Sequence, residues 1–370
     1  MDASEINNDR MVADLDCVQS KLPSILCHRF NISHLPSLHL VEETAYPYSR
    51  MRVIEFKTDS ALSKRLYLKR IAAPDAGAYI PETIVAREEK FLIQLNKKMP
   101  HESVHLVAAF PEYCTTVTEE CGGQLLGSII HSSPYWGLRS SDSCRNEELY
   151  YLCGKWLRKF HNCSKQERSN LRPWYNYLSG EMIWRIKQLS EDLPKHEYLL
   201  NSCNQRFLDD LDSLEPNGVS HMYHGDFAPH NIFVSNETIQ TIDFSGIKRG
   251  HGISDVINFL SSISPQPENL LPPRAFFRRF CQAFLAGYGP IDLPDPRISD
   301  LLLALQSVKR LFVLTQTQKN CGYLKALLAS RSANLHLSHL QSYIAKSNGN
   351  AISHGPWPYL YLAKALTHNR

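Results

Sequence analysis

The sequence predicts an α+β protein of two lobes, a small lobe built on an antiparallel sheet and a large lobe that is mainly helical. Short runs rich in apolar and β-branched residues at 65–71, 104–110 and 113–119 are bounded by turn residues, which is typical of strands. Apolar residues recur at helical spacing in 81–95 and 146–161. At 370 residues the chain is long enough to bury two cores.

The composition agrees with a soluble enzyme, with 43% hydrophobic and 21% charged residues. The polar start of the chain is unlike a signal peptide, and no apolar run approaches the roughly 18 residues that span a bilayer. The 10 cysteines include no Cys-x-x-Cys pair, which indicates reduced thiols rather than zinc ligands or disulfides. We therefore expect a cytoplasmic protein.

Residues 224–243 carry the residue types that phosphoryl transfer needs. A His224-Gly225-Asp226 cluster is followed by Asn231, five residues after the aspartate, and by Asp243 after an apolar run. Asp226 could accept the proton of an attacking hydroxyl, and Asn231 and Asp243 could hold a magnesium ion on nucleotide phosphates. Such a reaction mainly requires positioning and charge neutralisation, which a few carboxylates and an amide can supply.

The runs 232–234 and 238–242 are separated by a turn-like cluster and predict a β-hairpin. This hairpin would bring Asn231 and Asp243 to one end. The alternative is a surface loop that happens to contain these residue types. Five matched positions within twenty residues favour the catalytic interpretation.

This segment resembles the catalytic core of the aminoglycoside phosphotransferase and choline kinase family, the small-molecule branch of the protein-kinase-like fold. The resemblance covers residues 40–265. It implies that Asp226 is the catalytic base, that Asn231 and Asp243 bind the metal, and that His224 braces the loop. It also implies ATP and magnesium as cofactors.

The expected organisation has three parts. Residues 1–35 would form a helical extension packed on the small lobe. Residues 36–120 would form the small, nucleotide-binding lobe. Residues 121–370 would form the large lobe, which carries the catalytic hairpin, the acceptor site and a helical C-terminal part.

A lysine and a glutamate complete the expected nucleotide site. Lys69 follows an apolar run in the strand 65–71, and Arg70 would point to the opposite face. Glu88 falls on the apolar stripe of the helix that begins at Pro81. A carboxylate on the inward face of a helix needs a cation as its partner, and Lys69 is the expected cation. The pairing would direct the Lys69 ammonium group toward the nucleotide phosphates. On the strand pattern alone, Lys69 could equally be a solvent-facing residue.

The adenine would contact the backbone of the segment 119–123, at Glu119 and Cys121, where two glycines let the chain turn into the large lobe. The family's phosphate-cradling loop falls at 43–50, and this segment contains no glycine. Ser49 or Arg50 could substitute through a side chain. The missing glycine is the one feature that favours a nucleotide-binding pseudokinase acting as an interaction module.

In the large lobe, the helix 146–161 resembles the one that supports the catalytic loop, and we assign His161 to the core or a helix cap. The segment 165–220 is expected to be a helical insertion whose acidic run 209–212 is solvated. The glycine-rich segment 244–252 predicts a shaped loop.

By resemblance, Asp255 begins the helix after this loop and braces the catalytic loop through backbone hydrogen bonds. Ser254 or Asp255 is also suited to capping that helix. We place Lys248, Arg249 and His251 near the entrance for the acceptor.

The charge distribution bears on the acceptor. Residues 301–370 contain eight Lys and Arg and no Asp or Glu, although the net charge of the chain is only +3. The helices expected there, at 301–312 and 335–344, would not suit a polycationic drug, for which aminoglycoside phosphotransferases supply carboxylates. We expect a neutral or anionic acceptor, such as a sugar, a nucleoside, a phosphorylated metabolite, or a lipid or glycan head group. The alternative is a solvated basic face without a ligand.

The predicted partners are therefore ATP and a small-molecule hydroxyl acceptor, without nucleic acid. A peripheral membrane contact through the basic C-terminal region is a further expectation. An aminoglycoside or choline-type kinase is the alternative within the family. A protein kinase is disfavoured because no Ala-Pro-Glu segment follows Asp243. The sequence leaves open the acceptor, the hydroxyl that is phosphorylated, the choice between ATP and GTP, and the oligomeric state.

Overall fold

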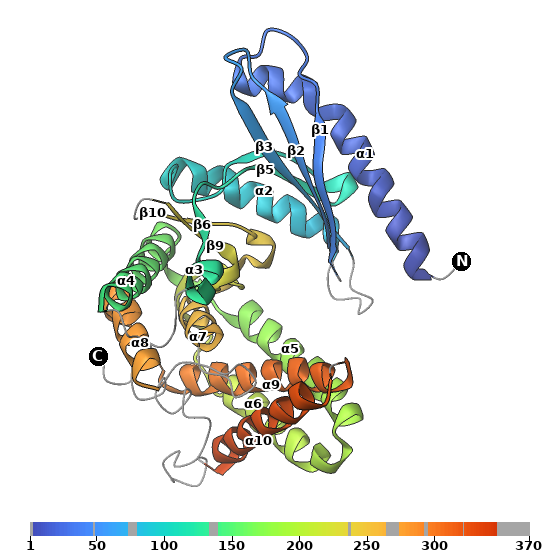
Figure 1. The fold of residues 1–370 in the computed structure, drawn as a ribbon. Helices are drawn as coiled ribbons and strands as arrows, with labels where there is room; N and C mark the ends of the chain where they lie inside the picture. The colour runs from blue at the N-terminus through green and yellow to red at the C-terminus, as the bar shows by residue number, and fades with distance from the viewer. Residues whose placement is uncertain are drawn as a thin grey trace. The chain divides into compact units, whose positions relative to one another are not determined.

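The computed structural model describes residues 3–46, 49–72, 80–132, 140–235, 238–263, 274–291, 295–320 and 322–345 (Figure 1). The chain divides into two compact units. The sheet unit comprises Met1–Leu125 and Asn231–Ile247, and the helical unit comprises Leu126–His230 and Lys248–Arg370. The mixed α+β character, with a small antiparallel sheet and mostly helical remainder, confirms the predicted fold class.

The sheet unit is built on five antiparallel strands in the order β1-β2-β3-β5-β4. These strands are β1 (His39–Tyr46), β2 (Ser49–Lys57), β3 (Ser63–Ile71), β4 (Leu106–Phe110) and β5 (Thr115–Glu119), with the 3₁₀ turn η1 (Pro111–Tyr113) before β5. The strands predicted at 65–71, 104–110 and 113–119 are confirmed. The glycine-free segment 43–50 forms the end of the β1–β2 hairpin, where Tyr46 pairs with Ser49.

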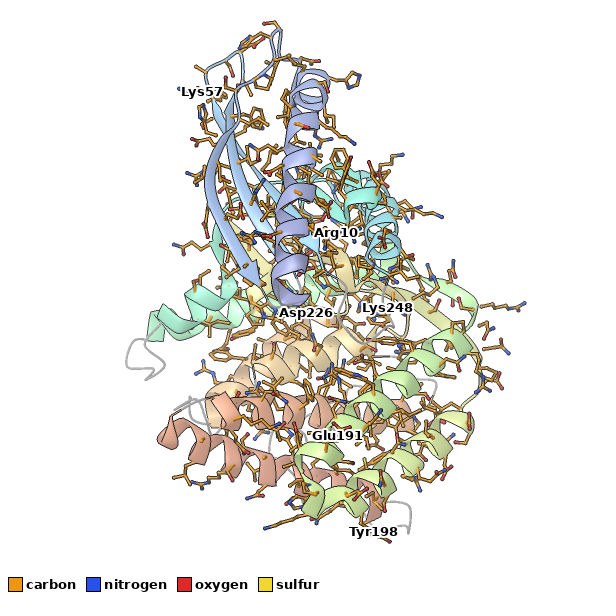
Figure 2. The ribbon with its side chains drawn as sticks, turned by 90° about the vertical axis from the view of Figure 1, so that its right-hand side faces the viewer. Arg10, Lys57, Glu191, Tyr198, Asp226 and Lys248 are labelled. Atoms are coloured by element: carbon orange, nitrogen blue, oxygen red, sulfur yellow. The ribbon has the colours of Figure 1, made fainter. Side chains whose placement is uncertain are left out.

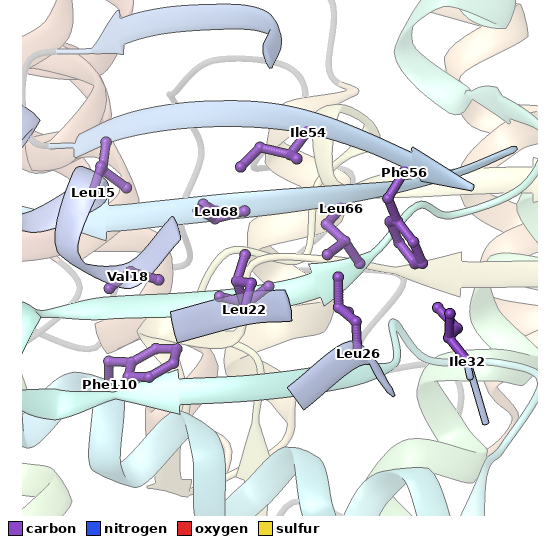
Figure 3. Close-up of a cluster of buried hydrophobic side chains, with 11 residues drawn as sticks. Leu15, Val18, Leu22, Leu26, Ile32, Ile54, Phe56, Leu66, Leu68 and Phe110 are labelled. Atoms are coloured by element: carbon purple, nitrogen blue, oxygen red, sulfur yellow. The ribbon is translucent and has the colours of Figure 1, made fainter. Parts of the chain in front are cut away.

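One face of this sheet is covered by α1 (Ala3–Phe30) (Figure 3). Leucine and valine side chains at helical spacing on α1 pack on alternate residues of the strands, which places both sets in one core. The members of this core include Leu15, Val18, Leu22, Leu26, Ile54, Phe56, Leu66, Leu68, Phe110 and Val117.

Two arginines on the same face bind α1 by charge. Arg70 donates to Asp14 at 2.9 Å, and Arg52 donates to Asp16 at 2.6 Å. Both guanidinium groups are almost buried, so these ion pairs are partly protected from solvent screening. Strand alternation therefore directs Arg70 to α1 and Lys69 to the other face.

The helix α2 (Pro81–Lys98) packs on the face that carries Lys69, where Ile84 and Val85 meet Ile71. It begins with a proline, whose missing N–H is not needed in the first helical turn. Glu88 lies on its buried side together with Phe91 and Leu92.

The predicted hairpin is present as β9 (Ile232–Ser235) and β10 (Thr238–Thr241). Its contacts group it with the sheet unit, although it was expected in the large lobe. The short strand β6 (Gln124–Leu125) pairs with β9. This pairing depends on Gly123, which has φ +93°, and a Cβ there would lie 2.1 Å from the carbonyl oxygen of Val234. The amide of Ile242 donates to the carbonyl of Asn231 at 3.0 Å, which closes the open end of the hairpin.

The helical unit contains a small sheet with the order β11-β8-β7 and a set of helices. Its strands are β7 (Gln166–Asn170), β8 (Asn217–Tyr223) and β11 (Lys248–Gly250). Its helices are α3 (Leu126–Ser132), α4 (Ser140–Cys163), α5 (Arg172–Asp192), η2 (Pro194–His196), α6 (Glu197–Asp212), α7 (Ile253–Ser262), α8 (Arg274–Tyr288), α9 (Arg297–Asn320) and α10 (Tyr323–Ala345). No helix in the described ranges is both long and apolar enough to cross a bilayer.

The helical unit corrects three expectations. The segment 165–220 contains the strands β7 and β8 besides helices. Asp210, expected in solvent, is 8% exposed because Arg206 and the hydroxyl of Tyr343 donate to its carboxylate. The residue that caps α7 is Gly252, without a side-chain hydrogen bond, and neither Ser254 nor Asp255 fills that position.

A close crossing of α4 and α8 positions the end of α4. A Cβ on Gly154 would lie 2.0 Å from the carbonyl oxygen of Phe284, and a Cβ on Gly287 would lie 2.0 Å from that of Tyr151. The two glycines therefore let the backbones approach. This crossing brings the hydroxyl of Tyr288, at the end of α8, within 2.9 Å of the His161 ring.

Candidate active site

The sheet unit brings Lys69 and Asp243 together. The Lys69 Nζ atom lies 2.5 Å from the Asp243 Oδ1 atom, and both side chains are about one-quarter exposed. Asp243 has φ 62° and ψ 67°, a left-handed conformation that is uncommon for a residue other than glycine. The hydroxyl of Ser245 donates to the same carboxylate oxygen at 2.5 Å. These contacts fix the carboxylate at the end of the hairpin.

Glu88 lies behind this pair and is 3% exposed. Burial raises the pKa of Glu88 to about 7, and the positive charge of Lys69 and hydrogen bonds from Phe244 and Thr116 oppose this rise. One carboxylate oxygen, Oε2, accepts no hydrogen bond. Lys69 therefore forms an ion pair with Asp243, and its charge also interacts with that of Glu88, the partner expected from the sequence.

Asn231 and Asp243 supply oxygen atoms at one end of the hairpin. Asn231 ends the 3₁₀ turn η3 (Pro229–Asn231) and is 5% exposed, and Asp243 directly precedes the turn η4 (Phe244–Gly246). Within the part of the chain that the structure describes, no three His, Cys, Asp or Glu side chains converge on a metal position. A carboxylate and an amide oxygen suit magnesium, which usually binds few protein groups and takes its other ligands from phosphates and water.

The expected adenine segment is held at the edge of the sheet. The Glu119 amide donates to the carbonyl of His105 at 2.9 Å, and the Glu119 carboxylate accepts from Arg29 of α1 at 2.9 Å. Burial raises the pKa of the Cys121 thiol to about 12, so this group stays protonated. The side chain of Glu119 therefore holds α1 on the sheet.

The residues proposed for the phosphate loop are engaged in the β1–β2 hairpin. Arg50 donates to Glu43 at 2.5 Å, and Arg52 binds the other oxygen of that carboxylate at 2.5 Å. Ser49 pairs in register with Ile71 of β3. These contacts leave the guanidinium of Arg50 bound to Glu43.

The loop predicted to be catalytic lies in the helical unit and carries Asp226, which is labelled in Figure 2. The Asp226 side chain is 51% exposed. The His230 Nε2 atom lies 3.1 Å from the Asp226 Oδ2 atom. The buried His224 ring accepts the Asp226 amide at 3.3 Å. The Asp255 carboxylate accepts the amides of His224 at 2.7 Å and Gly225 at 2.9 Å. The loop backbone is thus held while the Asp226 carboxylate stays accessible.

His161, which was expected in the core or at a helix cap, also contacts the residue that holds this loop. Its Nε2 atom lies 3.0 Å from Asp255 Oδ2, and its Nδ1 atom lies 2.9 Å from the Tyr288 hydroxyl. The His161 ring thus lies between the Asp255 carboxylate and the Tyr288 hydroxyl, so that these buried groups have hydrogen-bond partners. The sequence feature that could have indicated this contact is the position of His161 at the end of the helix expected to support the loop.

The three residues expected near the acceptor have different surroundings. The Lys248 ammonium lies 4.2 Å from the centre of the Tyr177 ring. The Arg249 guanidinium donates to Ser164 and Ser220 at 3.1 Å, and burial lowers its pKa. His251 is 4% exposed, and its ring accepts a backbone amide. Arg249 and His251 therefore serve the packing of the helical unit.

A small antiparallel sheet that carries the Lys69–Asp243 pair, followed by a helical unit with a braced His-Gly-Asp loop, defines a small-molecule kinase-like phosphotransferase. Residues 56–297 match the "Phosphotransferase enzyme family", and the chain belongs to that family. It is thus an enzyme that transfers a phosphoryl group to a hydroxyl group, as the sequence predicted. No curated protein matches the chain.

The chain is similar to solved structures of small-molecule kinases, and the first of these shares its fold. An amicoumacin kinase in complex with AMP-PNP and Ca²⁺ has 14% sequence identity and a TM-score of 0.54, over 87% of this chain and 91% of that chain. An ADP-bound aminoglycoside phosphotransferase has 12% identity and a TM-score of 0.47, over 86% and 97%. A choline kinase from Cryptosporidium parvum Iowa II has 12% identity and a TM-score of 0.46, over 90% and 98%.

Proposed function

We propose that the protein transfers the γ-phosphoryl group of ATP, with magnesium, to a hydroxyl of a small neutral or anionic molecule. The observation that carries this proposal is the Lys69–Asp243 pair with the buried Glu88 behind it. The exposed Asp226, on a loop whose amides bind Asp255, supports it from the helical unit.

Each residue has a stated role in this proposal. Asp243 and Asn231 would hold magnesium, which would neutralise phosphate charge. Lys69 supplies a second positive charge to the phosphates. Glu88 keeps that ammonium group directed by its own charge. Asp226 accepts the proton of the acceptor hydroxyl.

The acceptor's charge is proposed from the basic C-terminal part of the chain. The helix α9 and the described part of α10 contain Lys309, Arg310, Lys319 and Arg331 and no acidic residue after Asp300. The residues 346–370, which complete the acid-free segment, lie outside the described residues. The cytoplasmic location and the membrane contact remain predictions.

The test is a screen for magnesium-dependent ATP consumption against hydroxyl-bearing metabolites, sugars, nucleosides, choline and kanamycin. For an acceptor found in this way, Asp226→Ala should lower kcat by roughly 10²-fold, as expected for the loss of a general base. Asp212→Asn, which alters an 84% exposed carboxylate, is the control and should leave kcat unchanged.

Three outcomes would contradict parts of the proposal. Turnover that survives Asp226→Ala would remove the assignment of the base. Thermal stabilisation by ATP and magnesium without transfer to any acceptor would instead indicate a nucleotide-binding interaction module. Efficient phosphorylation of kanamycin or choline would overturn the acceptor class and leave the catalytic assignment standing.

A further inference from the structure

Two helices of the helical unit, α5 and α9, carry a cluster of charged side chains. The Arg185 Nε atom of α5 lies 3.3 Å from Glu181 Oε2, and the Lys309 Nζ atom of α9 lies 3.6 Å from the same oxygen. All three side chains are largely covered, with exposures of 19%, 13% and 30% for Arg185, Glu181 and Lys309. Two cations therefore share one carboxylate oxygen.

Within this cluster, Arg185 and Lys309 carry two positive charges and Glu181 carries one negative charge. The distance from Lys309 to Glu181 exceeds that of a normal hydrogen bond. Burial lowers the pKa of Lys309, the Glu181 charge raises it, and the Arg185 charge lowers it again. On the same helix, Lys319 is 53% exposed and has its own carboxylate, Asp192, at 2.5 Å. A half-buried cation such as Lys309 would gain from an additional anion.

The cluster is connected to the loop that carries Asp226. Of the causes that change the pKa of Lys309, the negative charge of Asp226 is the smallest, and it raises that pKa. Two hydrogen bonds of Asn258 also connect α9 to Phe227, the residue after Asp226. The Asn258 side chain donates to the carbonyl of Phe227 at 3.4 Å and accepts from Gln306 of α9 at 3.3 Å. Gln306 precedes Lys309 by one helical turn. Hydrogen bonds therefore connect the loop of Asp226 to the turn of α9 that precedes Lys309.

Aromatic rings fix one of the cations and add an apolar surface. The Arg185 guanidinium lies 5.1 Å from the centre of the Trp184 ring and 5.4 Å from that of Phe312. Such stacking restricts the guanidinium to one orientation. Trp184 is 37% exposed and Val313 is 49% exposed, so apolar side chains adjoin the charged cluster in solvent. Charge and apolar surface together suit a small organic anion.

We propose that Lys309 and Arg185 form an anion subsite for the acceptor, which therefore carries a carboxylate or phosphate group in addition to its reacting hydroxyl. This inference rests on the proposed phosphotransferase function and narrows its acceptor from neutral or anionic to anionic. The role of Glu181 is to hold the two cations in place while the ligand is absent.

The first experiment is independent of activity. The intact protein is treated with the neutral acylating reagent N-hydroxysuccinimide acetate, with the nucleotide site filled by AMP-PNP and magnesium, and acetylation of each lysine is followed by mass spectrometry. Inorganic phosphate or acetate should slow the acetylation of Lys309 by about threefold or more at saturation, because an ion pair shields the amine. Lys319 in the same sample is the control and should not be protected. Protection by phosphate alone or by acetate alone identifies the preferred group, and protection by neither overturns the subsite.

The second experiment uses the acceptor screen with sugars in amino, neutral, carboxylate and phosphate forms. Lys309→Gln should raise KM for the best anionic acceptor by about 10-fold, with little change in kcat, since a charge-assisted hydrogen bond contributes at least about 1.5 kcal/mol. Arg185→Gln should act in the same direction, and Lys319→Gln should have no effect. A fall in kcat at constant KM would mean that Lys309 acts on Asp226 and would overturn the proposal.

The two proposals can fail separately. Phosphate protection of Lys309 without turnover of any acceptor would refute the phosphotransferase function and leave the anion subsite. Equal turnover of neutral or cationic acceptors by wild type and Lys309→Gln, without protection, would refute the subsite and leave the function.

Discussion

Glu88→Gln should stabilise the protein at alkaline pH and have almost no effect at acidic pH. The Glu88 carboxyl group is 3% exposed, and folding raises its pKa from 4.5 to about 7. The folded protein therefore holds this proton at pH values where the unfolded chain has released it. For an acid whose folded pKa is raised, stability is greatest below the unfolded pKa and is lost as the pH rises through the folded pKa.

The magnitude follows from the size of the shift. The step from 4.5 to about 7, at about 1.4 kcal/mol for each pKa unit, corresponds to about 3 kcal/mol of lost stability above pH 7. Glutamine has nearly the same shape, keeps an acceptor for the Phe244 amide and the Thr116 hydroxyl, and carries no charge to bury. We expect a gain of about 3 kcal/mol at pH 8 and near zero at pH 4.5.

The assay is urea unfolding followed by far-ultraviolet circular dichroism across this pH range, with amide hydrogen exchange in α2 to locate the effect. Glu89→Gln, the adjacent and less buried glutamate, is the control and should give the same stability as wild type at every pH. A Glu88→Gln curve that runs parallel to wild type, or that loses stability at pH 8, would refute this account of the buried carboxylate. The same variant should bind AMP-PNP more weakly, because Lys69 loses the charge that directs it.

Two further predictions concern the other unit and the hairpin. Asp255→Asn should lower the free energy of unfolding by about 2–4 kcal/mol and reduce turnover, because its amide group would face an N–H where a carboxylate now accepts two backbone amides. Urea unfolding measures this loss of stability, with the surface variant Asp212→Asn as the control. An unchanged unfolding midpoint would contradict the prediction. Gly123→Ala should weaken the β6–β9 pairing, since its Cβ would lie 2.1 Å from the Val234 carbonyl oxygen. The expected result is faster amide hydrogen exchange in β6 and β9. Exchange as slow as in the wild-type protein would contradict this prediction.

The parts of the structure that the sequence predicted correctly depend on local patterns. Strand alternation placed Lys69 and Arg70 on opposite faces, and helical spacing placed Glu88 on the buried stripe of α2. The β-hairpin was predicted from two short apolar runs and a turn between them, which also placed Asn231 and Asp243 at its open end. These patterns involve residues within about twenty positions of one another, for which spacing alone defines geometry.

The features that the sequence did not predict depend on contacts between distant elements. The His161–Asp255 bond requires α4 and α7 to meet, and no periodicity in either helix encodes that meeting. Asp210 is buried because Tyr343 of α10 reaches it, although the acidic run around it is typical of a solvated face. The pairing of Lys69 with Asp243 depends on how the hairpin packs within the sheet unit. Neither spacing nor residue type determines such packing.

The division of the sheet unit into two chain segments has a consequence for synthesis on the ribosome. Its five-stranded sheet and α2 emerge first, but Asp243 belongs to the second segment, and all of Leu126–His230 must be translated before that segment appears. Until then, Lys69 lacks Asp243 as an ion-pair partner, and Glu88 lacks the Phe244 amide. A nascent small lobe can therefore collapse early on its apolar residues, but its charges reach their final arrangement only after half of the other unit has been made.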